Sequence, residues 1–315
     1  MMRGVTRLHE IMSQINIPGT VRRDEPLKQH TTFRVGGPAD VYIRPTDIPG
    51  LQRTLALLRT EQIPVLILGG GANVVVSDRG VRGAVIDTTG LSRISVSDTT
   101  VRVEAGAMIS DAAGETARRG LEGLEFLYSM PGTCGGAVWM NARCYGSSID
   151  EVLDSVNYLN EASELCTLTA AHEEFDYKLS PFQLHDWTIV EAVFTLRYGD
   201  ADELTHRMQQ YYRDRCAKGH FTLPCAGSVF KNDRRFGAPS GKILDELGVR
   251  GMTCGGARVS DLHANIIVNT GDATASDIRT LTHRLRDLVR AERGWELDPE
   301  ILFIGDWAED PHTSI

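Results

Sequence analysis

Two glycine-dense loops carry the strongest chemical signal in this sequence. GGGANVVVSDRGVRGAVI occupies residues 69–86 and PGTCGGAVWMNARCYG occupies residues 131–146, and apolar runs flank both. Consecutive glycines let a backbone turn sharply and aim several amide groups at one anion. Either loop alone also fits a plain tight turn, but two such loops predict one large phosphorylated ligand. Within the first loop, Asn73, Ser77 and Asp78 are expected to add polar contacts.

A local excess of positive charge is the second signal. Arg213, Arg215, Lys218 and His220 follow one another closely, and Lys231 comes shortly after them. The chain as a whole is acidic, with 33 Lys and Arg against 42 Asp and Glu and a net charge of −9. This acidity argues against nonspecific binding to nucleic acid or acidic membranes. The cluster is therefore either a solvated helix face or an anion pocket.

Length and composition indicate an ordinary soluble protein of two or three domains. The chain has 315 residues, of which 42% are hydrophobic and 24% charged, and no apolar run approaches the ~20 residues of a membrane span. The N-terminus MMRGVTRLHEIMSQ lacks the features of a secretory signal, so a cytoplasmic location is expected. The six cysteines form no CxxC pair and have no accompanying histidine spacing for zinc; we expect no metal site and mostly buried, reduced thiols.

Three units can be distinguished from the hydrophobic pattern. Residues 38–87 alternate strand-like runs with a helix around Leu51–Arg59, as in a small α/β unit. Residues 91–199 predict a hairpin over 94–106, a helix near Ser110–Arg119 and a strand-rich end, which is a mixed α+β pattern.

The third unit contains the charged segment. A charged helix is predicted over Asp202–Lys218, and PSGKILDELG predicts another. A long amphipathic helix over Ser276–Arg293 is expected to begin with Ser276 as its N-cap. WELDPEILFIG is predicted to close the chain as a strand, with Glu300 at its start.

Seven motifs in order give the sequence a family resemblance. They are HTTFRVGGPADVYIRP, GGGANVVVSDRG, GLEFLYSMPGTCGGAVWMNARCYG, YKLSPF, PCAGSVFKN, HANIIVN and LDPEILFIG. Together they resemble the UDP-N-acetylenolpyruvoylglucosamine reductases (MurB), and HANIIVN with YKLSPF resembles the shorter, second type. The resemblance implies NADPH-dependent, FAD-dependent reduction of an enolpyruvyl ether on a UDP-sugar, with ping-pong kinetics, giving UDP-N-acetylmuramate for peptidoglycan synthesis.

The fold implied by the resemblance is α+β, a vanillyl-alcohol-oxidase-like (PCMH-type) FAD-binding fold of two α+β subdomains plus a C-terminal α/β substrate-binding domain. The expected boundaries are an N-terminal helical extension over 1–20, FAD-binding subdomains over 21–88 and 89–200, a substrate-binding domain over 201–308 and a tail over 309–315. The expected partners are small molecules only, and the expected state is a monomer.

The same resemblance assigns the flavin site to the glycine loops. It would be formed by Gly69, Gly70, Gly71, Ala72, Asn73 and Val74 and by Gly132, Thr133, Gly135 and Gly136, with Asn141 and Ala142 near the ring. Glycine-rich backbone can approach the FAD pyrophosphate closely. A Rossmann site is the weaker interpretation, because the β-branched segment after Gly71 is a poor helix start.

Catalytic roles are implied by the resemblance at three positions. Ser228 matches the family's proton donor and Glu300 its catalytic glutamate, and Lys231 and Asn232 lie in the loop of Ser228. The Tyr-Arg pair of the family is Tyr177-Lys178 here, and its arginine contacts the substrate carboxylate. Lysine keeps the charge but loses the bidentate fork, so we expect reduced but real activity.

Further positions concern the substrate diphosphate and departures from the family. Arg215 and Lys218 match residues that bind the diphosphate of UDP, whereas the family's usual Gln-Pro is Gly219-His220 here. Arg143 replaces a loop glycine and would need room, with an extra phosphate contact as one outcome. Cys144 and Cys225 replace small residues and are expected to pack.

Two alternatives to the reductase remain open from the sequence. Lys178 and Arg143 would suit a catalytically impaired protein that binds flavin or UDP-sugar. A related FAD-dependent oxidase would reoxidise with oxygen and would not need Ser228. The presence of Ser228 together with Glu300 favours the reductase.

Overall fold

The computed structural model describes residues 17–170 and 174–307. Residues 1–16 of the expected N-terminal extension and the expected tail over 309–315 lie outside these residues. The chain divides into two compact units that alternate along the sequence. The first contains the described residues up to Arg23 together with Asp40–Gly70 and Gly83–Arg213, and the second contains Asp24–Ala39, Gly71–Arg82 and the residues from Asp214 onward. The expected boundaries at 88 and 200 stay a prediction.

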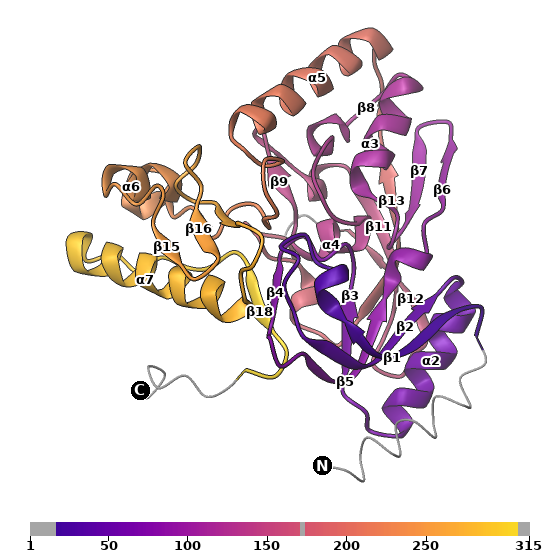
Figure 1. Cartoon of the computed structure of the whole chain (residues 1–315). Helices are drawn as coiled ribbons and strands as arrows, with labels where there is room; N and C mark the ends of the chain where they lie inside the picture. Colours follow the sequence, from indigo (N-terminus) through magenta and orange to yellow (C-terminus); the bar gives the residue numbers. More distant parts are fainter. Residues whose placement is uncertain (1–16, 171–173, 308–315) are drawn as a thin grey trace. The chain divides into compact units, whose positions relative to one another are not determined.

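The first unit contains two main sheets (Figure 1). One has the strand order β1-β2-β5-β3, in which β3 and β5 are parallel. The other is antiparallel with the order β12-β11-β13-β7-β6. The strands of these sheets are β1 (Gly19–Pro26), β2 (Pro38–Pro45), β3 (Val65–Leu68), β5 (Val81–Asp87), β6 (Ile94–Ser97), β7 (Thr100–Glu104), β11 (Leu153–Leu159), β12 (Leu165–Thr169) and β13 (Thr188–Thr195).

Shorter elements complete the first unit. Its helices are α2 (Ile48–Thr60), α3 (Ile109–Arg118), α4 (Cys134–Trp139) and most of α5 (Ala201–Ala217), and its two short antiparallel pairs are β8 (Leu121–Glu122) with β14 (Arg197–Tyr198) and β9 (Arg143–Cys144) with β10 (Ser147–Ser148). The alternation that predicted the hairpin is real, because Val101 and Val103 of β7 are buried beside exposed Arg102. Both side chains pack in one core with residues of α4 and β13. Helix α4, which contains part of the second glycine loop, therefore packs against the five-stranded sheet.

The second unit is built around helix α7 (Ala275–Arg293). Its other elements are β4 (Val74–Val76), α6 (Ser240–Glu246), β15 (Thr253–Cys254), β16 (Ala257–Val259), β17 (Ile267–Asn269) and β18 (Leu302–Ile304). β15, β16 and β17 form an antiparallel sheet, and β18 pairs in parallel with β4. Its core contains the buried stripe of α7 and, from the N-terminal segments, Phe33, Val35 and Val75.

Helix α7 begins one residue earlier than predicted, and Ser276 is not its N-cap. The cap is Thr274, whose side chain accepts a hydrogen bond from Asp277 N, and Asp277 completes a capping box. Ser276 instead donates from both its backbone N and its Oγ to Asp78. Several polar residues occur at this turn in the sequence. Ser276 is engaged by Asp78, and Thr274 is the capping residue.

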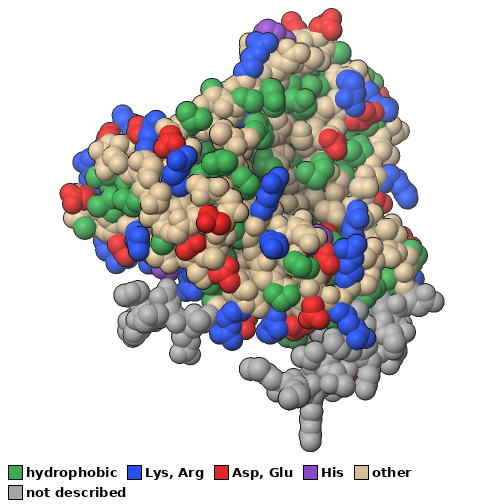
Figure 2. All heavy atoms as spheres, in the orientation of Figure 1, with side chains coloured by type: hydrophobic (Ala, Val, Ile, Leu, Met, Phe, Trp, Pro, Cys, Tyr) green, Lys and Arg blue, Asp and Glu red, His purple; other side chains and the backbone are tan. Residues whose placement is uncertain are grey.

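The cysteines are less buried than expected. Only Cys134 and Cys225 of the six are buried, whereas Cys216 is exposed and the other three are intermediate. All six are free thiols. On the face shown in Figure 2, acidic and basic side chains are intermixed, as the composition suggests.

Candidate active site

The two glycine loops approach each other closely within the first unit. A Cβ atom added at Gly69 would lie 2.3 Å from Thr133 Oγ1, and one at Gly70 would lie 2.9 Å from Gly132 Cα. Glycine is therefore required here by the close approach of two chain segments, since a side chain would displace backbone. The geometry agrees with the expectation that both loops serve one ligand.

Helix α4 starts from the second loop and is fixed to the end of β7. Cys134 N donates to Ala107 O and Gly135 N to Ala105 O, both at 2.8 Å. Gly136 differs from its neighbours, because it is exposed and only Thr133 Oγ1, at 3.6 Å, lies near its missing Cβ. Packing within the described residues therefore does not explain why this position is a glycine.

Two buried polar atoms in this region lack partners. Thr133 Oγ1 and Asn141 Oδ1 have no hydrogen-bond partner among the residues that the structure describes. An unsatisfied buried polar atom costs roughly 1–3 kcal/mol, so a bound polar ligand would relieve both. A flavin nucleotide offers phosphate oxygens to a threonine hydroxyl and a ring N–H to an amide oxygen, and the residues present fit it.

The Tyr177-Lys178 motif occupies the corner of a tight turn. The backbones of Asp176 and Leu179 pair in both directions at 3.1 Å, and Lys178 has a left-handed φ of +59°. Asn141 Nδ2 donates to Asp176 O at 2.9 Å. The carboxamide assigned to the predicted flavin site therefore also fixes the turn that carries Lys178.

A glutamine reinforces this connection. Gln183 Nε2 donates to Lys178 O at 3.1 Å and to Trp139 O, at the end of α4, at 2.7 Å. The turn and the second glycine loop are thus joined from two sides. No motif in the sequence singles out Gln183.

In the second unit, Ser228 and Glu300 lie on adjacent backbone segments. Glu300 N donates to Val229 O at 2.7 Å, and Ser228 forms a bridge with Ile266. Both residues are partly buried. Glu300 lies in the bend before β18, so the prediction that it opens the strand is wrong.

Asn265 holds this arrangement in place. Its Oδ1 accepts from Phe230 N at 2.9 Å, its Nδ2 donates to Phe230 O at 2.8 Å, and its backbone O accepts from Val229 N at 2.9 Å. The side chain is buried and its hydrogen bonds fix the loop beside Ser228. The sequence signal for this residue is an amide inside the apolar run of HANIIVN.

The remainder of the first glycine loop packs against the Glu300 segment. Asn73 Nδ2 donates to Glu300 O at 2.9 Å, and Leu302 N donates to Asn73 O at 2.9 Å. Gly71 has a φ of +59°, and a Cβ there would lie 2.0 Å from His30 O. Asn73 therefore has structural partners in addition to its predicted flavin role. Ala72 and Val74, which are predicted to contact the flavin as well, are its neighbours in the chain.

Ser77 makes a contact within its loop, as expected, since its Oγ accepts from Arg79 N at 3.1 Å, but Ser77 and Asp78 also make contacts outside that loop. Ser77 Oγ donates to Asp306 O at 2.6 Å. Asp78 accepts from Ala275 N and Ser276 N, at 2.8 and 2.9 Å. A carboxylate at a helix N-terminus satisfies free N–H groups and the helix dipole, and this is the role of Asp78.

The positive cluster is more than a solvated helix face. Arg215 is only 7% exposed, and Lys218 forms an ion pair with Asp214 at 2.7 Å. Burial lowers the pKa of His220 to about 4, and the charges of Arg215 and Lys218 act in the same direction. The rings of His220 and His263 have centroids 6.5 Å apart. Partly desolvated positive charge around neutral imidazoles is an environment suited to an anion.

The other predicted substrate residues have structural partners. Lys231 Nζ pairs with Asp298 at 2.8 Å, and its N donates to Asp298 O at 2.9 Å. Asn232 Oδ1 accepts from Ser240 N, at 2.9 Å, at the start of α6. Cys225 Sγ contacts His220 O at 3.5 Å, and burial raises its pKa, in keeping with a packing role.

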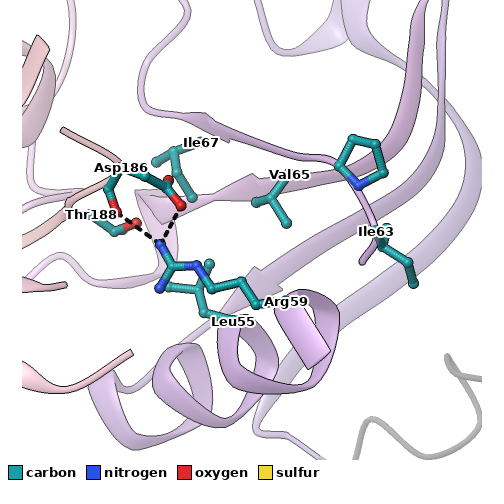
Figure 3. A pocket seen from close by; sticks show the side chains of 8 residues that line it. Leu55, Arg59, Ile63, Val65, Ile67, Asp186 and Thr188 are labelled. Atoms are coloured by element: carbon teal, nitrogen blue, oxygen red, sulfur yellow. Dashed lines mark hydrogen bonds and ion pairs between the residues drawn. The ribbon is translucent and has the colours of Figure 1, made fainter. Parts of the chain in front are cut away.

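A hollow of about 220 Å³ lies beside β3 and α2, and none of its lining residues is a predicted site residue (Figure 3). Its two charged members, Arg59 and Asp186, form an ion pair at 3.0 Å, and Arg59 also donates to Asn160 O at 2.6 Å. These contacts make Arg59 a structural link between α2 and the loops around it.

Arg143, which replaces a loop glycine of the family, lies in β9. Its side chain is exposed, so it has the space that such a replacement requires.

The described ranges, 17–170 and 174–307, contain neither a membrane-spanning helix nor a cluster of metal ligands. No helix there is long and apolar enough to cross a membrane. No group of three or more His, Cys, Asp or Glu side chains there could hold a metal ion.

Two regions of the chain match known protein families. Residues 39–169 match the FAD binding domain family, and residues 219–304 match the family described as UDP-N-acetylenolpyruvoylglucosamine reductase, C-terminal domain. The chain is 39% identical to the UDP-N-acetylenolpyruvoylglucosamine reductase of Treponema denticola, covering 92% of this chain and 95% of the relative. It is 37% identical to that of Caldanaerobacter subterraneus subsp. tengcongensis, covering 96% and 98%.

A solved structure extends the likeness to three dimensions. The reductase of Thermus caldophilus (MurB) superposes with a TM-score of 0.76 at 30% identity, covering 91% of this chain and all of that chain. The expected α+β FAD-binding fold is confirmed. With this similarity along nearly its whole length, the chain belongs to the UDP-N-acetylenolpyruvoylglucosamine reductase family.

Proposed function

We propose that this chain is an FAD-dependent, NADPH-linked reductase that converts UDP-N-acetylglucosamine enolpyruvate to UDP-N-acetylmuramate for peptidoglycan synthesis. It acts on small molecules as a cytoplasmic monomer. Membership of the reductase family supports the reaction. The observation that carries the assignment to this chain's own residues is the placement of Ser228 and Glu300 on adjacent segments, fixed by the hydrogen bonds of Asn265.

The flavin nucleotide would be held by the two glycine loops. Gly69 and Gly70 with Gly132 and Thr133 supply the close backbone, and the exposed Gly136 leaves space at the start of α4. Asn141, whose Oδ1 has no partner in the described chain, would meet the ring. Bound FAD supplies the hydride, which it receives from NADPH. In this assignment the expected subdomains 21–88 and 89–200 carry the flavin and 201–308 carries the sugar nucleotide.

The chain must stabilise negative charge and then deliver a proton. Hydride addition at C3 of the enolpyruvyl group leaves an electron pair shared by C2 and the carboxylate. Ser228 Oγ–H would give its proton to C2, forming the C–H bond, and the serine would regain a proton from solvent. Serine is a weak acid, so Glu300 would orient the transfer while cationic groups stabilise the developing charge.

Lys178 would supply positive charge for the substrate carboxylate, with Tyr177 beside it. Asn141 and Gln183 fix the turn that presents both residues. An ammonium group attracts a carboxylate without setting its orientation, whereas a guanidinium grips both oxygens. We therefore expect a working enzyme with looser substrate alignment.

Arg215 and Lys218 would bind the diphosphate of the UDP group. Burial of Arg215 strengthens its attraction for an anion, because less water screens it. Lys231 and Asn232 would act mainly by shaping the loop that carries Ser228, through Asp298 and Ser240.

The test is anaerobic stopped-flow spectroscopy of the flavin. NADPH is mixed with the FAD-loaded protein, and UDP-N-acetylglucosamine enolpyruvate is added after reduction. Rapid reoxidation by this substrate supports the reductase. Flavin that stays reduced until oxygen enters would indicate an oxidase, and FAD that NADPH does not reduce would indicate a binding protein.

Ser228→Ala separates the two half-reactions. It should slow reoxidation by substrate roughly 10²-fold or more, since a positioned acid contributes about that factor, and leave reduction by NADPH near the wild-type rate. Ser276→Ala, which alters a helix-terminal serine, is the matched control. Equal reoxidation rates for wild type and Ser228→Ala would contradict the role of Ser228.

A further inference from the structure

The loop after α5 and the loop before β17 bring two histidines together in the second unit. His220 and His263 have ring centroids 6.5 Å apart. A Cβ at Gly219 would lie 2.9 Å from Leu262 Cδ1, so the two loops touch directly beside the histidines. His220 belongs to the positive cluster noted in the sequence and stands where the family usually has proline, whereas His263 was not singled out as a site residue.

Each histidine is held by backbone contacts that fix its position. His220 N donates to Arg215 O at 3.1 Å, which joins it to the end of α5. His263 Nδ1 accepts from Asn265 N at 3.2 Å, and a Cβ at Gly241 would lie 2.9 Å from His263 Cε1. Because Nδ1 is an acceptor, the proton of neutral His263 is on Nε2, and that N–H is available to donate.

The surroundings of the pair are mainly positive. His220 faces Arg215, Lys218 and Asp214, and His263 faces Lys218, Arg250 and Asp245. Asp214 is paired with Lys218, and Asp245 with Arg250. Burial and these cations lower the pKa of both histidines, so both rings are neutral at pH 7. Both nearby carboxylates are thus paired with cations, and the charge around the imidazoles is positive on balance.

We propose that His220 and His263 are positioning residues of the anion pocket formed with Arg215 and Lys218, and that they take up protons when a sugar-nucleotide diphosphate binds there. This inference rests on the proposed function and adds two residues to it. A diphosphate close to the rings favours the imidazolium form, and an imidazolium donates charge-assisted hydrogen bonds. In His263, a proton on Nδ1 takes the place of the hydrogen bond accepted from Asn265 N, while Nε2–H donates. Binding should consequently tighten as the pH falls from 8.5 to 6.

The experiment is calorimetric titration of the full-length FAD-loaded protein with UDP. Titrations at pH 6 in two buffers of different ionisation enthalpy give the number of protons taken up. We expect uptake of about one proton per complex, shared between the two rings, and binding that is roughly tenfold tighter at pH 6 than at pH 8.5, the shift that a nearby opposite charge can produce. Uptake of no protons, with the same affinity at both pH values, would overturn the proposal.

Substitutions then assign the protons to these rings. His220→Gln and His263→Gln should each reduce the proton uptake and flatten the pH dependence of UDP binding, with Gln keeping a polar side chain of similar reach. His206→Gln, at an exposed position on α5, is the matched control and should change neither quantity. Proton uptake that persists unchanged in both test variants would also overturn the proposal.

A measurement on the wild-type protein avoids any effect of the substitutions on folding. In wild-type protein, histidine side-chain ¹⁵N shifts with and without UDP report protonation directly, and two rings should change toward imidazolium. UDP that binds tightly without these changes contradicts the histidine proposal and leaves the reductase assignment intact. Absence of UDP binding altogether contradicts both, and the stopped-flow reaction then shows whether the reductase assignment itself fails.

Discussion

Lys178 is the residue at which the motif resemblance predicts the clearest departure from the family's chemistry. Its backbone is already left-handed, and the turn is held by Asn141 and Gln183, so a longer side chain can be introduced without changing the fold. Lys178→Arg should raise turnover several-fold, roughly the effect of replacing a point charge by a bidentate fork. The measurement is steady-state kcat and KM for the enolpyruvyl substrate, with Lys28→Arg at an exposed site as control. A rate that stays equal or falls would count against the assigned role.

Gly136 offers a second test on a single residue. In the apo protein an added Cβ meets only Thr133 Oγ1 at 3.6 Å, and the residue lies in α4. Gly136→Ala should therefore leave stability equal or raise it by up to about 1 kcal/mol, since alanine is the better helix former. If the flavin nucleotide lies against this glycine, FAD affinity should fall at least several-fold in a fluorescence titration.

The neighbouring glycine provides the comparison. Gly70→Ala places its Cβ 2.9 Å from Gly132 Cα, so it should destabilise the apo protein itself. Unchanged FAD affinity in Gly136→Ala, with a weakened apo protein in Gly70→Ala, would separate a packing role from a cofactor role and contradict the flavin assignment of Gly136.

At the scale of elements, the cap of α7 gives a prediction about stability. Asp78 accepts hydrogen bonds from Ala275 N, Ser276 N and Ser276 Oγ. Asp78→Ala should lower the free energy of unfolding by about 1–2 kcal/mol, the usual cost of losing a capping side chain. Urea denaturation measures this value. Asp287→Ala, a 60% exposed aspartate in the middle of the same helix, should change it by less than about 0.5 kcal/mol.

Periodicity predicted most helices and strands because it reflects burial on one face. The alternation in β7 and the stripe of α7 are both local patterns, and both are buried as expected. The capping box of α7, Thr274 with Asp277, is local, but Ser276 was chosen as the cap because Asp78, which accepts from Ser276, lies far away in the sequence. Asn265 and Gln183 were missed for the same reason, since each acts on backbone groups of a distant segment.

At the scale of the whole molecule, the order of the units along the chain was hidden from the sequence. Each unit combines segments from both halves of the chain, and the core of the second includes Phe33 and Val75 beside the residues of α7. The hydrophobic patterns of these N-terminal segments resemble those of any strand or loop, and nothing in them specifies a partner more than 200 residues away. The motif resemblance identified the fold, while the pairing of β4 with β18 had to come from the structure.

The stability of the molecule should depend on pH through the half-buried histidine pair. The pKa of His220 is about 4 in the folded protein, below the model-peptide value of 6.5, and the pKa of His263 is also lowered. Between these values the unfolded chain binds protons that the folded chain excludes, so stability rises with pH across that range and is lost as pH falls through it.

Thermal unfolding between pH 7 and pH 4.5 measures this effect. The apo protein should lose stability over this interval, and the double variant His220→Gln with His263→Gln should lose less of it. Saturating UDP should also reduce the loss, because a bound diphosphate would let the folded state take up the same protons. Identical pH profiles for wild type and double variant would mean that other groups cause the acid sensitivity. A profile that UDP shifts upward without changing its shape would mean that the ligand stabilises the fold without charging the histidines.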